Sequence, residues 1–122
     1  MNFDENKPIY LQIIDEIKRR IVKEEYRPGD KISSVREFAL SLGVNPNTVQ
    51  RALSELERDS LVVSERTAGR FITKDEKIIQ ELKDEVIQYK IDQFVKDIES
   101  YDYDKEKVLM MLKERLRDGK TN

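Results

Sequence analysis

The chain has 122 residues, of which 38% are hydrophobic and 39% are charged, so it is too short for a large enzyme but can form modest cores beneath highly charged helix surfaces. It contains no cysteine and no histidine, which excludes disulfides and thiolate chemistry and leaves the chain without the usual zinc ligands or the commonest general base. No segment approaches the roughly 18 consecutive apolar residues of a membrane span, and the polar start lacks a secretory signal. We therefore expect a cytoplasmic protein with no metal and no cofactor.

The distribution of charge does not by itself indicate a partner. Residues 1–74 hold 13 basic and 12 acidic side chains, and residues 75–122 hold 10 and 13. Because neither half is strongly basic, a nucleic-acid partner has to be argued from where individual side chains lie. The carboxylates are scattered among Lys and Arg without a glycine-rich phosphate loop, which is typical of solvated helix surfaces.

The first periodic segment, residues 8–26, predicts an amphipathic helix. Its apolar residues recur three or four positions apart, Pro8 suits a first helical turn, and the turn residues of RPGD at 27–30 end the segment. The apolar face comprises Ile9, Ile13, Ile14, Ile17, Ile21 and Val22.

The second and third predicted helices are joined by a tight turn. Ser34 and Glu37 fit a capping box at the start of a short helix that Gly43 ends. Asn45 is the predicted N-cap of the next helix, and Pro46 occupies its first position. The core face of this helix comprises Val49, Ala52, Leu53 and Leu56. Two helices separated by so short a turn are typical of a helix-turn-helix.

The rest of the chain predicts a hairpin and two further helices. After Ser60, two β-rich runs on either side of RTAG indicate a hairpin, and from Asp75 a long charged helix resumes. After a break at SYDYD, a final helix precedes the polar tail of residues 118–122. We expect a mainly α fold with a small β-hairpin: a winged helix-turn-helix DNA-binding domain at residues 1–74 and a two-helix dimerisation region at residues 75–122.

Polar side chains gather at the start of the third predicted helix. A recognition helix enters the major groove by its N-terminal turn, where backbone N–H groups approach phosphate and short polar side chains reach base edges. Asn and Gln form bidentate hydrogen bonds with adenine, and Arg pairs with guanine or with phosphate. We therefore expect DNA contacts from Asn47, Thr48, Gln50 and Arg51.

Each of these residues also has a structural alternative. Asn45 and Thr48 are suited to capping, and for Asn45 we favour capping over its candidate role at DNA. Arg51 has Glu55 one helical turn along as a potential ion-pair partner. For Asn47, Gln50 and Arg51, taken with Arg36, we favour DNA contact because the predicted fold gives them one shared outward surface.

Four ordered blocks, PIYLQI, PGDKISSVREFA, LGVNPNTVQRALSELE and GRFIT, resemble the GntR family of bacterial transcriptional repressors over about residues 8–73. The resemblance implies a winged helix-turn-helix homodimer that binds a two-fold operator and whose third helix reads the major groove. It also implies that Arg36, in the same block as Ser34, contacts DNA from the start of the second helix. The wing tip, here Arg66 and Thr67, would enter the minor groove.

Two positions depart from the family pattern. Ile32 and Ser33 stand where Leu-Pro is usual, and the wing has only Gly69 where the family usually has two glycines. Thr67 places a side chain where bare backbone would fit best, which would hinder close approach to the minor groove. The sequence leaves open whether Arg66 compensates by entering a narrow groove or is a solvated turn residue.

The two C-terminal helices are too short to enclose a ligand pocket within one protomer, and their apolar stripes would be exposed on a monomer. We expect the stripes to pair with those of a second copy, as the resemblance of this short tail to the YtrA subfamily implies. The predicted dimerisation residues are Ile79, Leu82, Val86, Tyr89, Ile91, Phe94, Ile98, Val108, Met111, Leu112 and Leu116. A small-molecule effector site between protomers is the alternative for the aromatic and methionine side chains, although interface core is their commoner use.

Together these features predict a homodimeric transcriptional repressor that binds an inverted repeat of double-stranded operator DNA, with half-site centres roughly 34 Å apart. One alternative is an interaction protein whose winged helix docks a protein partner, which the near-neutral charge of the first half favours. An enzyme is not expected, because the sequence offers no set of nucleophile, base and orienting residue.

Overall fold

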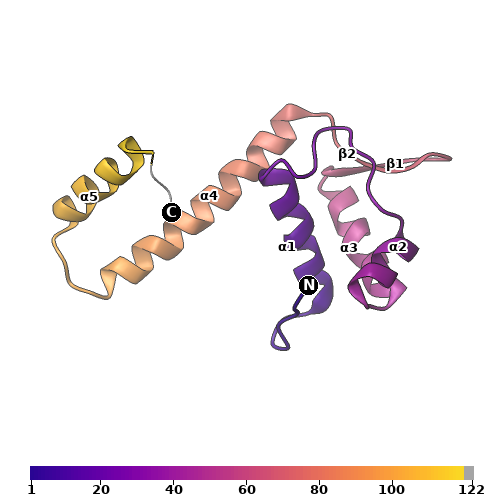
Figure 1. The fold of residues 1–122 in the computed structure, drawn as a ribbon, viewed down its shortest axis with the longest axis horizontal. Coiled ribbons are helices and arrows are strands. Elements are labelled where there is room, and N and C mark those ends of the chain that lie inside the picture. The colour runs from indigo at the N-terminus through magenta and orange to yellow at the C-terminus, as the bar shows by residue number, and fades with distance from the viewer. Residues whose placement is uncertain (120–122) are drawn as a thin grey trace. The chain divides into compact units, whose positions relative to one another are not determined.

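A computed structural model describes residues 1–119, so the last three residues of the expected polar tail lie outside the described residues. In chain order the elements are α1 (Ile9–Val22), α2 (Val35–Leu42), α3 (Pro46–Arg58), β1 (Val62–Glu65), β2 (Gly69–Ile72), α4 (Glu76–Glu99) and α5 (Lys105–Arg117) (Figure 1). This mainly helical fold with one small antiparallel sheet confirms the predicted fold class. No helix in the part of the chain described is both long and apolar enough to cross a membrane.

The chain forms two compact units, Met1–Val86 and Ile87–Asn122, which divide within α4. The first unit therefore extends past the wing and includes the first turns of α4. The functional boundary between residues 74 and 75 stays a prediction.

Helix α1 ends earlier than the sequence predicts. The periodic segment suggests a helix as far as Tyr26, but the helix ends at Val22, and Glu24 adopts a left-handed backbone conformation with φ of 62°. The backbone N–H groups of Glu25 and Tyr26 both donate to the carbonyl oxygen of Arg20, at 2.8 and 3.0 Å, which closes the C-terminal turn. A local C-terminal turn thus stops a run of residues that all have good or moderate helix propensity.

The helix-turn-helix forms as its capping signals predict. The Ser34 hydroxyl oxygen accepts a hydrogen bond from the backbone N–H of Glu37 at 3.1 Å, and the Glu37 carboxylate accepts one from the backbone N–H of Ser34 at 2.9 Å. Gly43 ends α2 in the left-handed conformation with φ of 68°, where a side chain would be strained. The Asn45 side chain caps α3, and Pro46 is its first residue.

The wing is the two-stranded hairpin of β1 and β2, paired in the register Val62↔Ile72 to Glu65↔Gly69. The segment before α2 adds to its edge: Ile32 N–H donates to the carbonyl oxygen of Arg70 at 3.0 Å, and Ile72 N–H donates to that of Asp30 at 2.8 Å. These bonds fix the wing beside the start of α2, an arrangement that the sequence did not indicate.

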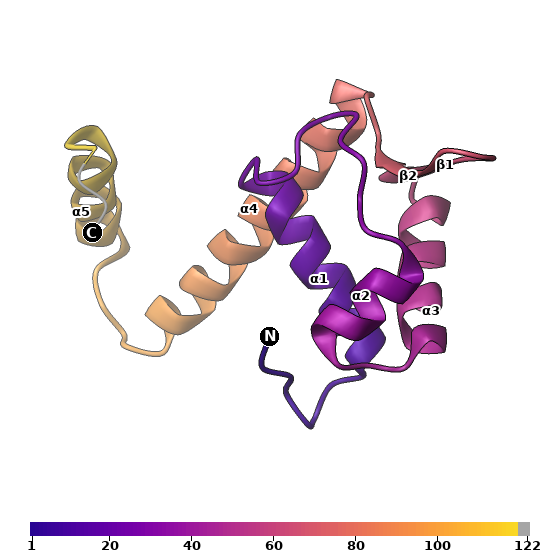
Figure 2. The same ribbon diagram turned by 45° about the vertical axis from the view of Figure 1, so that its right-hand side comes forward.

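One apolar core holds the first unit together. Helices α1 and α2 both pack against α3 (Figure 2). The face of α3 predicted to be buried is wholly inaccessible to solvent at Val49, Ala52, Leu53 and Leu56, each 0% exposed. The other large side chains that are almost fully buried are Ile13, Ile17, Ile21, Val62 and Ile72. Because α3 packs over its whole length, its opposite face is held rigidly toward solvent.

The second unit consists of the C-terminal part of α4 and the whole of α5, which are joined by a short turn. The Asp104 carboxylate caps α5 by accepting the backbone N–H of Glu106 at 2.9 Å. None of the residues of α5 is buried. The described residues of this unit, 87–119, therefore form no apolar core that is closed from solvent within one chain.

Candidate nucleic-acid interface

The first two turns of α3 present polar side chains to solvent. Asn47 and Gln50 are exposed and Thr48 is half-buried, as expected for the side of α3 that faces away from the core. The Gln50 amide nitrogen donates to the Ser54 hydroxyl oxygen at 3.1 Å, which orients the amide along the helix. Asn45 has the capping role favoured above, because its side-chain amide oxygen Oδ1 accepts a hydrogen bond from the backbone N–H of Asn47 at 2.7 Å.

Arg51 does not form the ion pair that the sequence offers it. Glu55 instead pairs with Arg58, at 3.2 Å between the nitrogen and the carboxylate oxygen. The Arg51 guanidinium lies over the ring of Tyr10 from α1, with 3.8 Å between its central carbon and the ring centroid. Tyr10 is a site residue that the sequence analysis missed, because no local pattern connects the first turn of α1 with α3.

The start of α2 carries the second group of candidate contacts. Ser34 uses its hydroxyl oxygen as an acceptor within the capping box, so its hydroxyl hydrogen is available to a phosphate oxygen. The backbone N–H of Ser34 donates to Glu37 and lowers the pKa of that carboxyl below its usual value. Arg36 lies between these two residues and its side chain is exposed.

The wing tip carries the third group. Arg66 and Thr67 lie in the turn between β1 and β2, and both are exposed. At the base of the wing, Arg70 pairs with Glu57 of α3 at 2.6 Å, so this cation already has a partner within the chain. Gly69 has φ of 113°, and a Cβ placed there would lie 3.1 Å from the Lys31 side chain. The wing therefore needs glycine at this position.

Ion pairing separates the arginines of the first unit into two groups. Four arginines of the first unit form no ion pair: Arg36, Arg51 and Arg66, each of which lies in one of the three candidate segments, and Arg27, which lies in the turn after α1. The paired arginines are Arg19, Arg20, Arg58 and Arg70. The nearly balanced net charge of residues 1–74 thus conceals three unpaired arginines in the candidate segments, which are available to an anionic partner.

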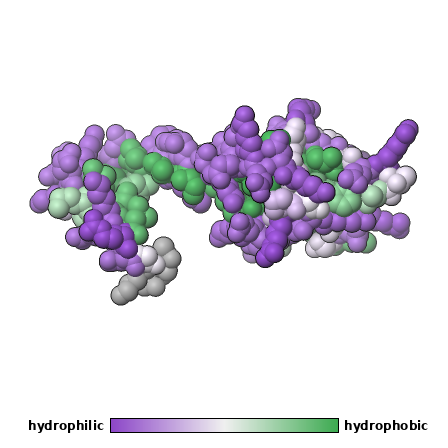
Figure 3. Space-filling view, turned by 90° about the horizontal axis from the view of Figure 1, so that it is seen from above, coloured by the Kyte–Doolittle hydropathy of each residue, from purple (hydrophilic) through white to green (hydrophobic). Residues whose placement is uncertain are grey.

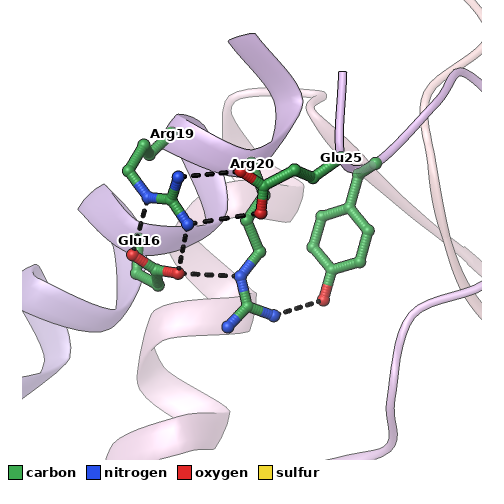
Figure 4. A network of polar contacts seen from close by, with 5 residues as sticks. Glu16, Arg19, Arg20 and Glu25 are labelled. Carbon is green, nitrogen blue, oxygen red and sulfur yellow. Dashed lines mark hydrogen bonds and ion pairs between the residues drawn. The ribbon is translucent and has the colours of Figure 1, made fainter. Parts of the chain in front are cut away.

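A network at the end of α1 accounts for two of the paired arginines (Figure 4). The Glu16 carboxylate accepts hydrogen bonds from Arg19 at 2.9 Å and from Arg20 at 2.8 Å. These bonds, chiefly that from Arg19, lower the pKa of Glu16 from 4.5 to about 2. Arg20 also donates to the hydroxyl oxygen of Tyr26 at 3.2 Å. The network ties the chain after α1 back to the helix and has a structural role.

The predicted dimerisation residues divide between the two units. Ile79 and Leu82 are 7% and 4% exposed and belong to the core of the first unit, and Val86 packs partly against that core. This placement removes Ile79 and Leu82 from a surface that a second chain could cover, which corrects their assignment. The same apolar stripe continues into the second unit. The spacing of its residues therefore does not distinguish side chains buried in the core of one chain from side chains that a second chain would bury.

The remaining predicted dimerisation residues lie in the second unit, and all of them except Tyr89 line its apolar grooves. Figure 3 shows hydrophobic side chains gathered over α4 and α5. Ile98 and Val108 are half-buried, and the exposed members are Tyr89, Ile91, Phe94, Met111, Leu112 and Leu116. A groove of about 620 Å³ runs between the two helices and includes Phe94 and Leu112 in its lining. An open apolar groove of this kind is typical of an interaction surface. No group of acidic side chains in residues 1–119 is arranged to hold a metal ion.

Comparison with known proteins identifies the family. The model of the bacterial regulatory proteins of the gntR family matches residues 9–72. The HTH-type transcriptional regulator YhcF of Bacillus subtilis is 45% identical over 111 residues, which cover 91% of this chain and 92% of that protein. The HTH-type transcriptional repressor YtrA of Bacillus subtilis is 37% identical over 114 residues, which cover 93% of this chain and 88% of that protein.

Solved structures share the same architecture. A GntR family transcriptional regulator from Listeria monocytogenes is 38% identical and superposes with a TM-score of 0.83, covering 92% of this chain and 98% of that one. The DNA-binding domain of AraR in complex with operator ORE1 is 26% identical and superposes with a TM-score of 0.53, covering 59% of this chain and 90% of that one. Proteins of the GntR family are DNA-binding regulators and not enzymes. The chain therefore belongs to the GntR family, in its YtrA subfamily, and is a DNA-binding transcriptional regulator.

Proposed function

We propose that this regulator is a repressor that binds an inverted-repeat operator as a homodimer. The observation that carries the proposal is that the arginines of the three candidate segments have no carboxylate partner. These three cations lie on α2, on α3 and at the wing tip. A winged helix-turn-helix brings these three segments to one duplex.

In this proposal α3 enters the major groove by its first two turns. Asn47 and Gln50 are suited to pair with the N6 and N7 edge of adenine, and Thr48 is suited to contact either a base edge or a thymine methyl group. Arg51 is suited to the O6 and N7 edge of guanine or to a phosphate. The N-terminal N–H groups of α3 add a favourable interaction with nearby phosphate.

The flanking segments would fix the position of α3 on the duplex. Arg36 and Ser34 would contact phosphate from the start of α2, where the helix dipole also favours an anion. Arg66 would enter the minor groove at the wing tip, and Thr67 limits how closely the backbone can follow. Asn45 would act chiefly through its cap on α3.

The second unit would supply the dimer contact. Its exposed apolar face is self-complementary in character, with aromatic, aliphatic and methionine side chains on both helices. Association of two copies would remove this face from water, which is the main favourable contribution to such an interface. A two-fold dimer of this kind would place two α3 helices on half-sites roughly 34 Å apart. A small effector bound in the groove between protomers stays a prediction.

Two relatives support repression and operator binding as the function of this chain. The YtrA relative is named a repressor and matches 93% of this chain, including both units. The AraR domain that superposes on this chain was solved in complex with its operator.

Selection of bound duplexes from a random pool, followed by fluorescence anisotropy of the enriched sequence, tests the proposal. We expect an inverted repeat to be enriched and its binding to weaken steeply with salt. Absence of enrichment, combined with capture of a defined protein partner, would favour the interaction-protein alternative instead.

A further inference from the structure

The contact between Tyr10 and Arg51 joins two helices that the sequence keeps far apart. Tyr10 lies in the first turn of α1, and Arg51 lies in the second turn of α3. The 3.8 Å between the guanidinium carbon and the ring centroid is well within the range of a cation–π interaction. The other contact of this kind, between Arg20 and Tyr26, is longer at 5.7 Å, and there the arginine also pairs with a glutamate.

This contact holds Arg51 without occupying its hydrogen-bond donors. The five N–H groups of a guanidinium lie in its plane, whereas an aromatic ring interacts with the face of that plane. An ion pair with Glu55 would have used some of those donors, but Glu55 pairs with Arg58. The donors of Arg51 therefore stay available for a base edge or a phosphate.

The ring is itself held in place. Tyr10 is half-buried and packs against the core of the first unit, and α1 lies against α3. Arginine loses substantial rotamer freedom when it is fixed, and a group that is already fixed loses less of it on binding. An anchored ring is thus a suitable platform for an exposed arginine.

We propose that Tyr10 is a positioning residue for DNA recognition, which orients Arg51 so that the arginine binds its target with higher affinity and greater base preference. This inference rests on the proposed function, since it requires Arg51 to contact DNA. It assigns to α1 a part in recognition beyond its part in the core.

A double-mutant cycle on the full chain tests this role, with a duplex selected by the wild-type chain as the probe. We expect Tyr10→Leu to weaken binding roughly three- to tenfold, and Tyr10→Phe, which keeps the ring, to stay within about twofold of the wild type. Arg51→Ala should weaken binding at least about tenfold. In the Arg51→Ala background, Tyr10→Leu should have an effect of less than about twofold.

Base preference gives a second readout that a structural role of Tyr10 would not change. Tyr10→Leu should flatten the preference at the same operator positions as Arg51→Ala and leave the other positions unchanged. If Tyr10→Leu does not fold, as judged by its thermal transition, Tyr10→Met replaces it, because methionine keeps the apolar bulk without a ring.

The outcomes separate the two proposals. Wild-type affinity in Arg51→Ala would remove this arginine from the proposed interface. If Arg51→Ala binds weakly, two results for Tyr10→Leu would refute the positioning role and leave the proposed function standing. One is wild-type binding by Tyr10→Leu. The other is an equal loss of affinity from Tyr10→Leu in the wild-type and Arg51→Ala backgrounds.

Discussion

Replacing Arg36 with alanine should change how strongly DNA binding depends on salt. The three candidate segments offer three arginines per protomer without an ion pair, and hence six per dimer: Arg36, Arg51 and Arg66 from each copy. If each neutralises one phosphate, the slope of log K against log salt concentration is about −5.4, since each contact contributes about −0.9. Arg36→Ala removes two contacts per dimer and should bring the slope to about −3.6, with affinity roughly ten- to a hundredfold lower at moderate salt.

Fluorescence anisotropy titrations of one labelled operator duplex over a series of salt concentrations measure this slope. Arg19→Ala is the matched control, because Arg19 is also an exposed arginine of the first unit but is paired with Glu16 and Glu25. The control should keep the wild-type slope. Two results would show that ion pairing does not decide which arginines contact DNA. One is an unchanged salt slope in Arg36→Ala, and the other is a slope reduced as much by Arg19→Ala as by Arg36→Ala.

Three further predictions concern stability and assembly. Leu53→Ala removes a side chain that is 0% exposed and should lower the free energy of unfolding by about 2–5 kcal/mol in urea titrations; a loss below about 1 kcal/mol would contradict the packing described. The folded-state pKa of Glu16 is lowered to about 2, so its ion network stabilises the fold above its unfolded pKa of 4.5 and loses this effect as pH falls toward 2. Between about pH 7 and about pH 3 the wild type should therefore lose about 1 kcal/mol more stability than Glu16→Gln, after allowance for solvent screening, and equal losses would be inconsistent with the network. Phe94→Asp places a charge on the apolar face of the second unit and should weaken dimerisation roughly hundredfold in sedimentation velocity, whereas Leu40→Asp, at a side chain 78% exposed on α2, should not.

Local signals in the sequence predict the helix-turn-helix well. The Ser34–Glu37 capping box, the Gly43 stop and the Asn45 cap each act within three residues, so the sequence contains all of their partners. The core face of α3 follows from helical periodicity for the same reason. The exposure expected of Asn47, Gln50 and Arg51 is confirmed, and their contact with DNA stays a prediction.

Features that depend on distant residues were not predictable in this way. The position of Arg51 depends on Tyr10, about forty residues earlier in the chain. The core position of Ile79 depends on the packing of the first unit, which the spacing of an apolar stripe does not reveal.

In the proposed complex, two copies joined through the second unit place two α3 helices on one duplex. Sedimentation equilibrium of the full chain with an enriched operator duplex tests this arrangement, because it gives the mass of the complex. We expect two chains per duplex on an inverted repeat whose half-site centres are roughly 34 Å apart. One chain per duplex at saturation, or equal affinity for a duplex that carries a single half-site, would contradict it.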